Sequence, residues 1–209
     1  MPHTSSQKFS WIIGIVAPFY YFILMETLAA LWTGYDSIIQ HMSELGGVES
    51  PYMTIMNVAG FMGVGILILI FSYGFFTVEF TKNTWYKLAT VFLWIAGIFM
   101  VIVGFFPCDA GCIDVTTTGQ LHSLTSIPQS IALPLAIVFA AFGHQMETVW
   151  NKSWFGISLV LGFGSLLMGP LMSSGQYDAY VGLLQRIGIG FCLLWIGFYS
   201  VRQLKSKNP

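Results

Sequence analysis

The chain has 209 residues, of which 56% are hydrophobic and only 8% are charged, and its formal net charge is −1. Soluble domains carry about 25% charged residues, so this composition excludes an ordinary soluble fold, which needs polar side chains to cover its core. The near-neutral charge also gives no basic surface for nucleic acid. We therefore expect an integral membrane protein whose natural partners are membrane lipids.

Six stretches of the chain are apolar enough to cross a bilayer, which takes roughly 20 residues of helix. Each is expected to be helical, because a backbone in lipid has to satisfy its own hydrogen bonds. The first stretch is too long for a signal peptide and is expected to stay in the protein. The spans are Trp11–Trp32, Met53–Val78, Tyr86–Phe106, Ser123–Phe142, Phe155–Leu171 and Leu183–Val201. The sequence thus predicts an all-α fold, a single six-helix transmembrane bundle over residues 1–209.

The basic residues fall almost entirely on one side of this six-span arrangement. Arg186 lies on one side, and the seven others lie on the opposite side: Lys8, Lys82, Lys87, Lys152, Arg202, Lys205 and Lys207. Cytoplasmic loops carry an excess of Lys and Arg. Both termini are therefore predicted to lie in the cytoplasm, and the protein is predicted to be a multi-pass protein of the cell (cytoplasmic) membrane.

Glu26 lies in the outer half of the first predicted span. A carboxylate at membrane depth is costly and is a functional hypothesis by default. Its predicted hydrogen-bond partners are Asn57 in the second span and Tyr20 or Tyr21 on its own helix. If Glu26 carries protons, it would do so together with polar residues of another span.

The first predicted outer loop, Thr33–Tyr52, contains the string YDSIIQHMSELGG. This string supplies an imidazole, a hydroxyl and a carboxylate from His41, Ser43 and Glu44. Such groups are able to act in acid–base or nucleophilic chemistry. We therefore expect this loop to contribute to any site at the outer face.

The second predicted outer loop, Pro107–His122, holds two cysteines in a C-x3-C spacing. Outside the cytoplasm such a pair is able to form a disulfide, and free thiols are a second interpretation. The third is a metal site beside Asp109, because thiolate and imidazole ligands suit zinc or copper, although the spacing matches no strong metal motif. The candidate ligands are His41, Cys108, Cys112 and His122.

His122 opens the fourth span, and Ser126, Gln129 and Ser130 follow it at helical spacing on one face. This polar stripe is expected to face the bundle interior, because lipid offers no hydrogen bonds. It would either line a cavity or bond to neighbouring helices. Pro128, Pro134 and Pro170 are expected to kink their helices and to free backbone carbonyls.

The fifth span carries small residues at spacings of three and four, a pattern typical of close helix packing. A sliding or gating surface is the alternative interpretation. The residues of this small-residue stripe are Ser158, Gly162, Ser165 and Gly169.

Arg186 stands at the head of the sixth span, on the side that the charge rule disfavours. A cation at that depth needs a carboxylate partner or has to extend its charged end toward water. Glu44 and Asp109 are the predicted partners. One interpretation is a structural ion pair that fixes loops to the bundle. The other is a binding site for a phosphate or carboxylate head group.

The third predicted outer loop, Met172–Gly182, adds Tyr177 and Asp178. Titratable residues from three loops are thus predicted to form one shallow pocket at the outer face. The candidate catalytic residues are Ser43, Glu44, Asp109, His122 and Arg186. His122 or Glu44 would serve as general base, and Arg186 would stabilise an anionic group. The sequence contains no phosphate-binding glycine loop, HExxH motif or nucleophile elbow, and it names no cofactor.

Several motifs follow one another along the chain. They are YDSIIQHMSELGG followed by Pro51, then Asn57, FPCD at residues 106–109, His122, and GLLQR at residues 182–186. In these motifs nearly the whole chain resembles the uncharacterised prokaryotic membrane family DUF998. The resemblance implies a six-helix fold whose signature residues are Ser43, Glu44, Asp109, His122 and Arg186, and it implies no activity. The two cysteines around Asp109 look like a local addition. The chain also bears a remoter likeness to membrane hydrolases that hold zinc with three histidines, a Ser and an Asp. It offers Ser43, Asp109 and His122 but lacks the late histidine pair of those enzymes.

Three functions follow from these observations. The first is the binding or processing of a lipid or other amphiphile in the outer pocket. The second is a non-enzymatic scaffold or accessory subunit, with other membrane proteins as partners and the polar cluster as a buried lock. The third is a small proton-coupled transporter that uses Glu26 and the polar stripe of the fourth span. The sequence does not decide whether the protein is an enzyme.

Overall fold

The computed structural model describes residues 3–147 and 152–206. These residues form six helical segments that are long and apolar enough to cross a membrane, and they contain no strand. The all-helical fold and the count of six spans predicted from the sequence are therefore confirmed. The segments are α1 (Ser5–Leu31); α2 (Met53–Ile55), η2 (Met56–Met62) and α3 (Gly63–Glu79) in one run; α4 (Thr84–Val103); α5 (Thr117–Gln145); α6 (Lys152–Ser173); and η4 (Asp178–Tyr180) with α7 (Val181–Lys205).

Most of the helices extend beyond the apolar stretches by which they were recognised. Helix α1 begins at Ser5, because Thr4 and Gln7 form a capping box that satisfies the first backbone N–H groups. Helix α5 begins six residues before Ser123, because the Thr116 side chain accepts from the backbone N–H of Gly119. Helix α4 instead ends at Val103, three residues before the predicted end. Hydropathy locates the part of a helix in hydrocarbon, whereas caps set its actual ends.

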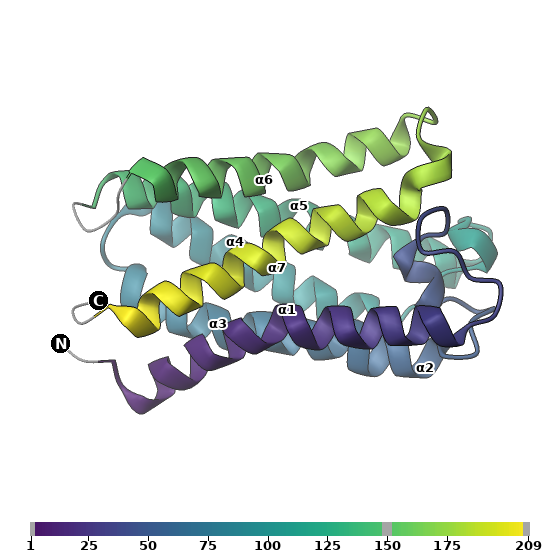
Figure 1. The fold of residues 1–209 in the computed structure, drawn as a ribbon, viewed down its shortest axis with the longest axis horizontal. Helices are drawn as coiled ribbons and strands as arrows, with labels where there is room; N and C mark the ends of the chain where they lie inside the picture. Colours follow the sequence, from purple (N-terminus) through teal and green to yellow (C-terminus); the bar gives the residue numbers. More distant parts are fainter. Residues whose placement is uncertain (1–2, 148–151, 207–209) are drawn as a thin grey trace.

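The six spans form a closed ring in which each segment packs against two neighbours, in the order α1, α3, α4, α5, α6, α7 and back to α1. Both chain ends lie at one end of the bundle (Figure 1), which we call the terminal end. The opposite end, which we call the distal end, holds residues 32–52, 104–116 and 174–177. Lys207 and part of the loop before α6 lie outside the described residues.

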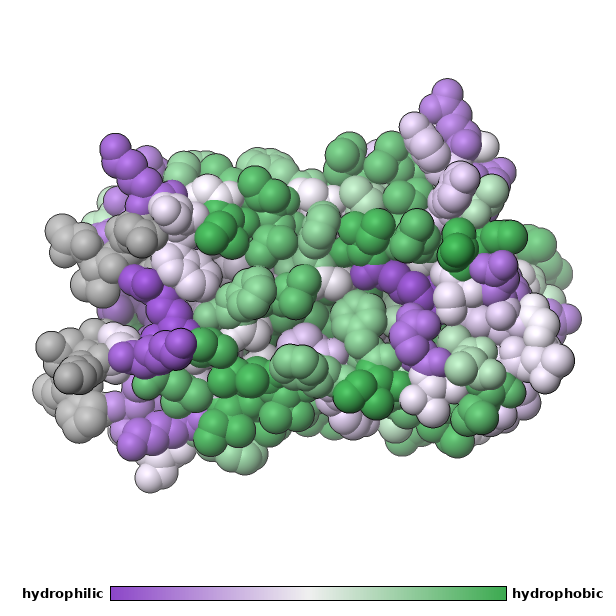
Figure 2. All heavy atoms as spheres, viewed as in Figure 1, coloured by the Kyte–Doolittle hydropathy of each residue, from purple (hydrophilic) through white to green (hydrophobic). Residues whose placement is uncertain are grey.

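The outer surface of the ring matches a membrane environment. Apolar side chains cover the middle of the face drawn in Figure 2, and hydrophilic residues gather at its two ends. Large apolar side chains such as Phe19, Ile23 and Val160 are more than half exposed. In water such a surface would be a strong association site, whereas lipid tails cover it at no cost. The chain is a multi-pass membrane protein.

The terminal half of the ring is filled by interlocking aromatic side chains. Trp11, Phe71, Phe75, Trp195 and Tyr199 are all fully buried and contact one another edge-on or tilted, with ring centroids 5.1–6.4 Å apart. Aromatic pairs prefer these geometries to a face-to-face sandwich. This packing fills the centre of the terminal half with side chains.

A buried carboxylate that the sequence analysis did not single out lies beside this aromatic core. Glu79, at the end of α3, is only 1% exposed. Its Oε1 accepts from the Tyr199 hydroxyl at 2.6 Å and from the Gln203 amide at 3.0 Å, and its Oε2 pairs with Lys82 Nζ at 3.1 Å. Because these donors come from α7 and from the turn after α3, Glu79 ties three parts of the chain together at the terminal end.

We predict that Glu79→Ala lowers the free energy of unfolding by about 3 kcal/mol, because it leaves the Tyr199 hydroxyl and the Gln203 amide without their acceptor. In a chain of this size the melting temperature should fall by about 6–12 °C. Thermal unfolding in detergent measures the change. Glu49→Ala, at an exposed position in the distal loop, is the matched control and should shift it little. A Glu79→Ala variant that melts with the control would show that the network contributes no stability.

Candidate functional site

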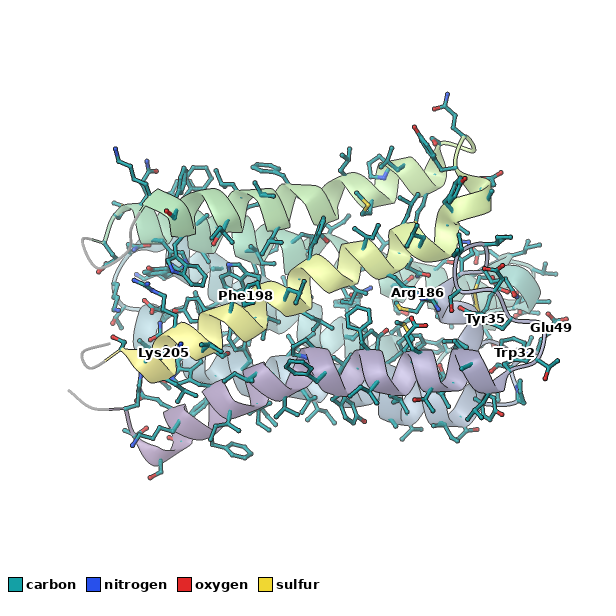
Figure 3. All side chains as sticks on the ribbon, in the orientation of Figure 1. Trp32, Tyr35, Glu49, Arg186, Phe198 and Lys205 are labelled. Atoms are coloured by element: carbon teal, nitrogen blue, oxygen red, sulfur yellow. A yellow bond between two sulfur atoms is a disulfide. The ribbon has the colours of Figure 1, made fainter. Side chains whose placement is uncertain are left out.

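The guanidinium of Arg186 fixes the first distal loop to α1 and α7. Its Nε donates to Glu26 Oε1 at 2.9 Å, and Nη1 donates to the carbonyl of Gly182 at 3.2 Å. Nη2 donates to the hydroxyls of Tyr35 and Ser37 at 3.1 and 3.2 Å. Arg186 is 8% exposed and lies beside Tyr35 at the distal end, far from Lys205 at the terminal end (Figure 3). Every nitrogen of the guanidinium therefore has a protein partner.

The partners predicted for Arg186 and Glu26 were wrong. Arg186 pairs with Glu26, and Glu44 and Asp109 make no ion pair with it among the described residues. Glu26 likewise bonds to Arg186 and Ser37, whereas the Tyr20 hydroxyl donates to Ala59 and the Asn57 amide to Gly46. The physical reason is closure of the helix ring, which brings the first and last spans together.

Tyr35 connects Arg186 to the rest of the first distal loop, residues 32–52. Its hydroxyl accepts from Arg186 and donates to the carbonyl of His41 at 2.9 Å, and its ring stacks on Trp32. Burial raises the pKa of the Tyr35 hydroxyl, against the opposing effect of the Arg186 guanidinium, so the phenol keeps its proton and remains a donor. The loop also contacts α7 directly, through the Leu183 N–H and the Ile38 carbonyl at 3.0 Å.

Glu44 holds the short 3-10 turn η1 (Met42–Gly46) in place. One carboxylate oxygen accepts from the His41 backbone N–H at 2.8 Å and the other from the Gln40 amide at 2.9 Å. The turn is docked on α7, because the Met42 N–H donates to the Gln185 side-chain carbonyl at 2.7 Å. Both oxygens of Glu44 thus serve local structure, and Gln185 of α7 holds the start of the turn.

Asp109 likewise holds the second distal loop, residues 104–116, in place. One oxygen accepts from the backbone N–H groups of Val115 and Thr116 at 2.9 and 2.7 Å, and the other accepts from the Thr116 hydroxyl at 2.7 Å. These bonds to Thr116 lower the pKa of the Asp109 carboxyl, with a smaller contribution from Val115. Asp109 packs against Gly119, where a Cβ would meet its carboxylate. The residue fixes the start of α5.

In the structure Cys108 and Cys112 are joined by a disulfide. The Ser43 hydroxyl lies 3.3 Å from Cys112 Sγ and is the donor, because a disulfide sulfur carries no proton. The Val48 N–H bonds to the Cys108 carbonyl at 3.0 Å, so the two distal loops are pinned to each other. Among the described residues no three His, Cys, Asp or Glu side chains form a group that could hold a metal. The candidate metal ligands are therefore not assembled.

Asn57 lies in the π-helical turn η2, which interrupts the second span. Its amide Nδ2 donates to the carbonyl of Gly46 at 2.9 Å, and a Cβ on Gly46 would come within 2.5 Å of Asn57 Oδ1. The glycine therefore permits the close approach of η1 to the helix. Asn57 thereby anchors the far end of the same turn that Gln185 holds at its start.

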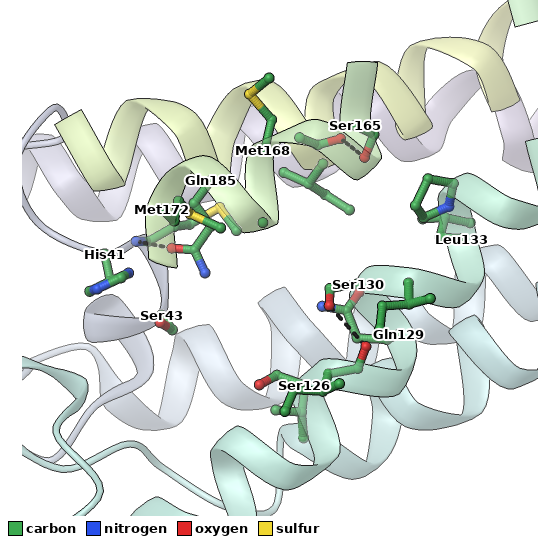
Figure 4. Close-up of a pocket in the computed structure, with 18 of the residues that line it drawn as sticks. His41, Ser43, Ser126, Gln129, Ser130, Leu133, Ser165, Met168, Met172 and Gln185 are labelled. Carbon is green, nitrogen blue, oxygen red and sulfur yellow. Dashed lines mark hydrogen bonds between the residues drawn. The ribbon is translucent and has the colours of Figure 1, made fainter. Parts of the chain in front are cut away.

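The distal half of the ring contains a cavity of about 630 Å³. Its walls come from the η1 and η2 turns, α4, α5, α6, α7 and Cys112 of the second distal loop. Figure 4 shows polar and sulfur-containing side chains around the open space. Residues from the predicted polar stripe line it, namely His122, Ser126, Gln129 and Ser130. The stripe was predicted either to line a cavity or to bond to neighbouring helices. It lines the cavity, and the hydroxyls of Ser126 and Ser130 donate only to carbonyls of their own helix.

His122 forms part of the cavity wall in a defined tautomer. Its Nδ1 lies 2.6 Å from the carbonyl of Phe106, which only accepts, so Nδ1 carries the proton. Nε2 is then an acceptor, and within the described ranges no protein donor reaches it. The ring packs edge-on against Phe61, another residue of the wall.

The small-residue stripe of α6 separates into a packed part and an open part. Ser158 accepts from the Trp195 indole at 2.9 Å, Gly162 packs on Val138, and the Ser165 hydroxyl donates to the Gly188 carbonyl at 2.8 Å. Gly169 instead lines the cavity, and a Cβ there would meet nothing within 4 Å. Close packing thus holds for the first three positions, whereas the distal end of α6 diverges from α5.

A comparison with known protein families adds one finding. The model of the family described as Protein of unknown function (DUF998) matches residues 15–202 of the chain. The chain belongs to this family. No curated protein and no solved structure shows a significant match.

The signature residues expected for DUF998 separate into two groups in this structure. Ser43 and His122 line the cavity. Glu44, Asp109 and Arg186 do not, because their polar atoms bond to the loops and helices that surround it. In this DUF998 protein the second group holds the loops and helices around the cavity, and the first group belongs to the cavity wall. Gln185 and the methionines of α6, which the sequence analysis did not select, complete the wall.

We predict a pH dependence from Asp109. Because its folded-state pKa lies below the ordinary value of 3.8, the carboxylate stabilises the fold fully above that value, and the contribution is lost as the pH falls through the folded-state pKa. Asp109→Asn should therefore melt below the wild type at pH 7, and the difference should shrink as the pH approaches about 3. Melting curves across this range measure it, with Asp178→Asn at an exposed position as control. Parallel curves for wild type and Asp109→Asn would contradict the assignment.

Proposed function

We propose that this DUF998 protein binds an amphiphile in the distal cavity, within the cell membrane, with its termini in the cytoplasm and the cavity on the extracytoplasmic side. The orientation is supported by the charges of the described residues. Lys8, Lys82, Lys87, Lys152, Arg202 and Lys205 belong to the terminal end, and Arg186 to the distal end. An excess of basic residues marks the cytoplasmic side.

The observation that carries the proposal is the two-sided lining of the cavity. Hydrogen-bonding groups from the distal loops and the α5 stripe continue directly into an apolar wall that includes Leu133, Leu166, Met168, Met172 and Ile189. A purely polar ligand would leave this wall wet, and a purely apolar one would leave the polar groups without partners. A molecule with a polar head and an apolar tail satisfies both.

We infer that the cavity opens toward lipid between α5 and α6. Ile127 and Ile131 belong to its wall and are 55% and 46% exposed. Near Gly169 the facing wall of α6 leaves open space. A tail is therefore able to enter between α5 and α6 directly from the bilayer, without passing through water.

The acidic residues give catalysis no support, whereas His122 keeps an Nε2 acceptor on the cavity wall and stays the candidate general base predicted from the sequence. A general base has to be oriented toward the reacting atom, but the carboxylate oxygens of Glu44 and Asp109 are engaged within their own loops. Glu26 is paired with Arg186, which weakens its case as a proton carrier. A scaffold role with other membrane subunits stays a prediction of the sequence.

We predict that Gly169→Trp fills the cavity and prevents amphiphile binding. The probes are a diazirine-bearing monoacylglycerol and a fatty acid with the same chain, photolysed with the protein in phosphatidylcholine nanodiscs. At least one should label α5 or α6 at the cavity, and Gly169→Trp should reduce that labelling about tenfold, which corresponds to about 1.4 kcal/mol.

Gly156→Trp is the matched control. It changes the same residue type on the same helix, also with nothing within 4 Å of an added Cβ, but outside the cavity. Labelling by neither probe, or equal loss in both variants, would refute the proposed function.

A further inference from the structure

The residues around the cavity are polar without being charged. The wall contains serines, glutamines, two histidines and apolar residues, and no Asp, Glu, Lys or Arg belongs to it among the described residues. An anionic or cationic group in such a site would lose its hydration without meeting a permanent counter-charge in the wall, which is costly in a low-dielectric environment. This argues against both phosphate and ammonium head groups.

Arg186 does not supply the missing positive charge. It is not part of the wall, and its Nε, Nη1 and Nη2 donate to Glu26, Gly182, Tyr35 and Ser37. Recruiting it to an anion would break the anchor of the first distal loop. The sequence-based interpretation of Arg186 as a phosphate or carboxylate site therefore has no support in this geometry.

The cavity offers more acceptors than donors. The hydroxyls of Ser126 and Ser130 donate to carbonyls of their own helix at 3.0 and 2.9 Å, which leaves their oxygen lone pairs for a ligand. His122 presents Nε2 as an acceptor, because Nδ1 donates to Phe106. A phosphate or carboxylate carries only acceptors, so it would meet these atoms lone pair to lone pair.

Two amide groups and the His41 imidazole complete the pattern, and the imidazole adds one donor and one acceptor. Gln185 uses its side-chain carbonyl for the Met42 N–H at 2.7 Å, so its NH₂ group is a donor toward the cavity. The Gln129 amide has no protein partner within the described part of the chain, and it offers one acceptor and one NH₂ group. A hydroxyl group donates and accepts at once, so it matches a site of several acceptors and a few donors.

We propose that the head group bound in this cavity is uncharged and bears hydroxyls, as in a monoacylglycerol, and that the site discriminates against the same lipid carrying a phosphate. This inference rests on the proposed function and adds the chemical class of the ligand. Ser126, Gln129, Ser130 and His122 would contact the hydroxyls, and the tail would lie along α6.

The test compares monooleoylglycerol with its phosphate ester, which differs only in the added phosphate. Each competes with the diazirine monoacylglycerol for photolabelling in phosphatidylcholine nanodiscs at pH 8. Sugar-headed detergents are left out, because they are themselves uncharged amphiphiles that bear hydroxyls. Monooleoylglycerol should compete at a concentration at least about tenfold lower than its phosphate ester. Gln129→Leu should weaken competition by monooleoylglycerol about three- to tenfold and leave that by the phosphate ester unchanged.

Ser126→Ala and Ser72→Ala are the matched pair that separates a binding effect from a folding effect. Both remove a hydroxyl that donates to the carbonyl three residues earlier in its helix, but Ser72 on α3 is not part of the cavity. Only Ser126→Ala should weaken competition by monooleoylglycerol for photolabelling. Equal or stronger competition by the phosphate ester would overturn the inference while the proposed function stands. Absence of labelling and competition by every lipid would overturn both.

Discussion

A guanidinium placed at membrane depth has to find partners inside the protein, because lipid offers none. Arg186 finds them on α1, on its own helix and on the first distal loop. The loop is thereby held over the start of α7, and Gln185, one residue earlier, fixes the η1 turn. That turn forms one wall of the cavity. The position of His41 and Ser43 therefore depends on an ion pair that neither residue contacts.

The need of buried polar groups for partners inside the protein also explains why the two ends of the bundle differ. At the terminal end the polar groups of Glu79, Tyr199 and Gln203 satisfy one another beneath a tightly packed aromatic core. At the distal end the loops satisfy their own polar atoms through Glu44 and Asp109, and the groups on α5 are left facing open space. Unsatisfied polar groups inside a membrane protein are where a ligand gains most.

Much of this arrangement could be predicted from the sequence, and the failures have a common cause. The six spans followed from hydropathy, and the stripe from His122 to Ser130 followed from helical spacing, because both are local patterns. The pairing of Arg186 with Glu26 depends on which helices are neighbours in the ring, and no local pattern encodes that. The Glu79 network was missed for the same reason. Gly169 looked like its packed neighbours because sequence does not show where α6 diverges.

The measurement that tests this account most directly is a pair of double-mutant cycles on thermal stability. One cycle combines Arg186→Met with Glu26→Gln, and the other combines Arg186→Met with Glu44→Gln. The first should show a coupling of about 1 kcal/mol, modest because the Glu26 side chain is half exposed, and the second should be additive. Additivity in the first cycle, or coupling in the second, would mean that the guanidinium is anchored elsewhere and that the wall of the cavity is not held as described.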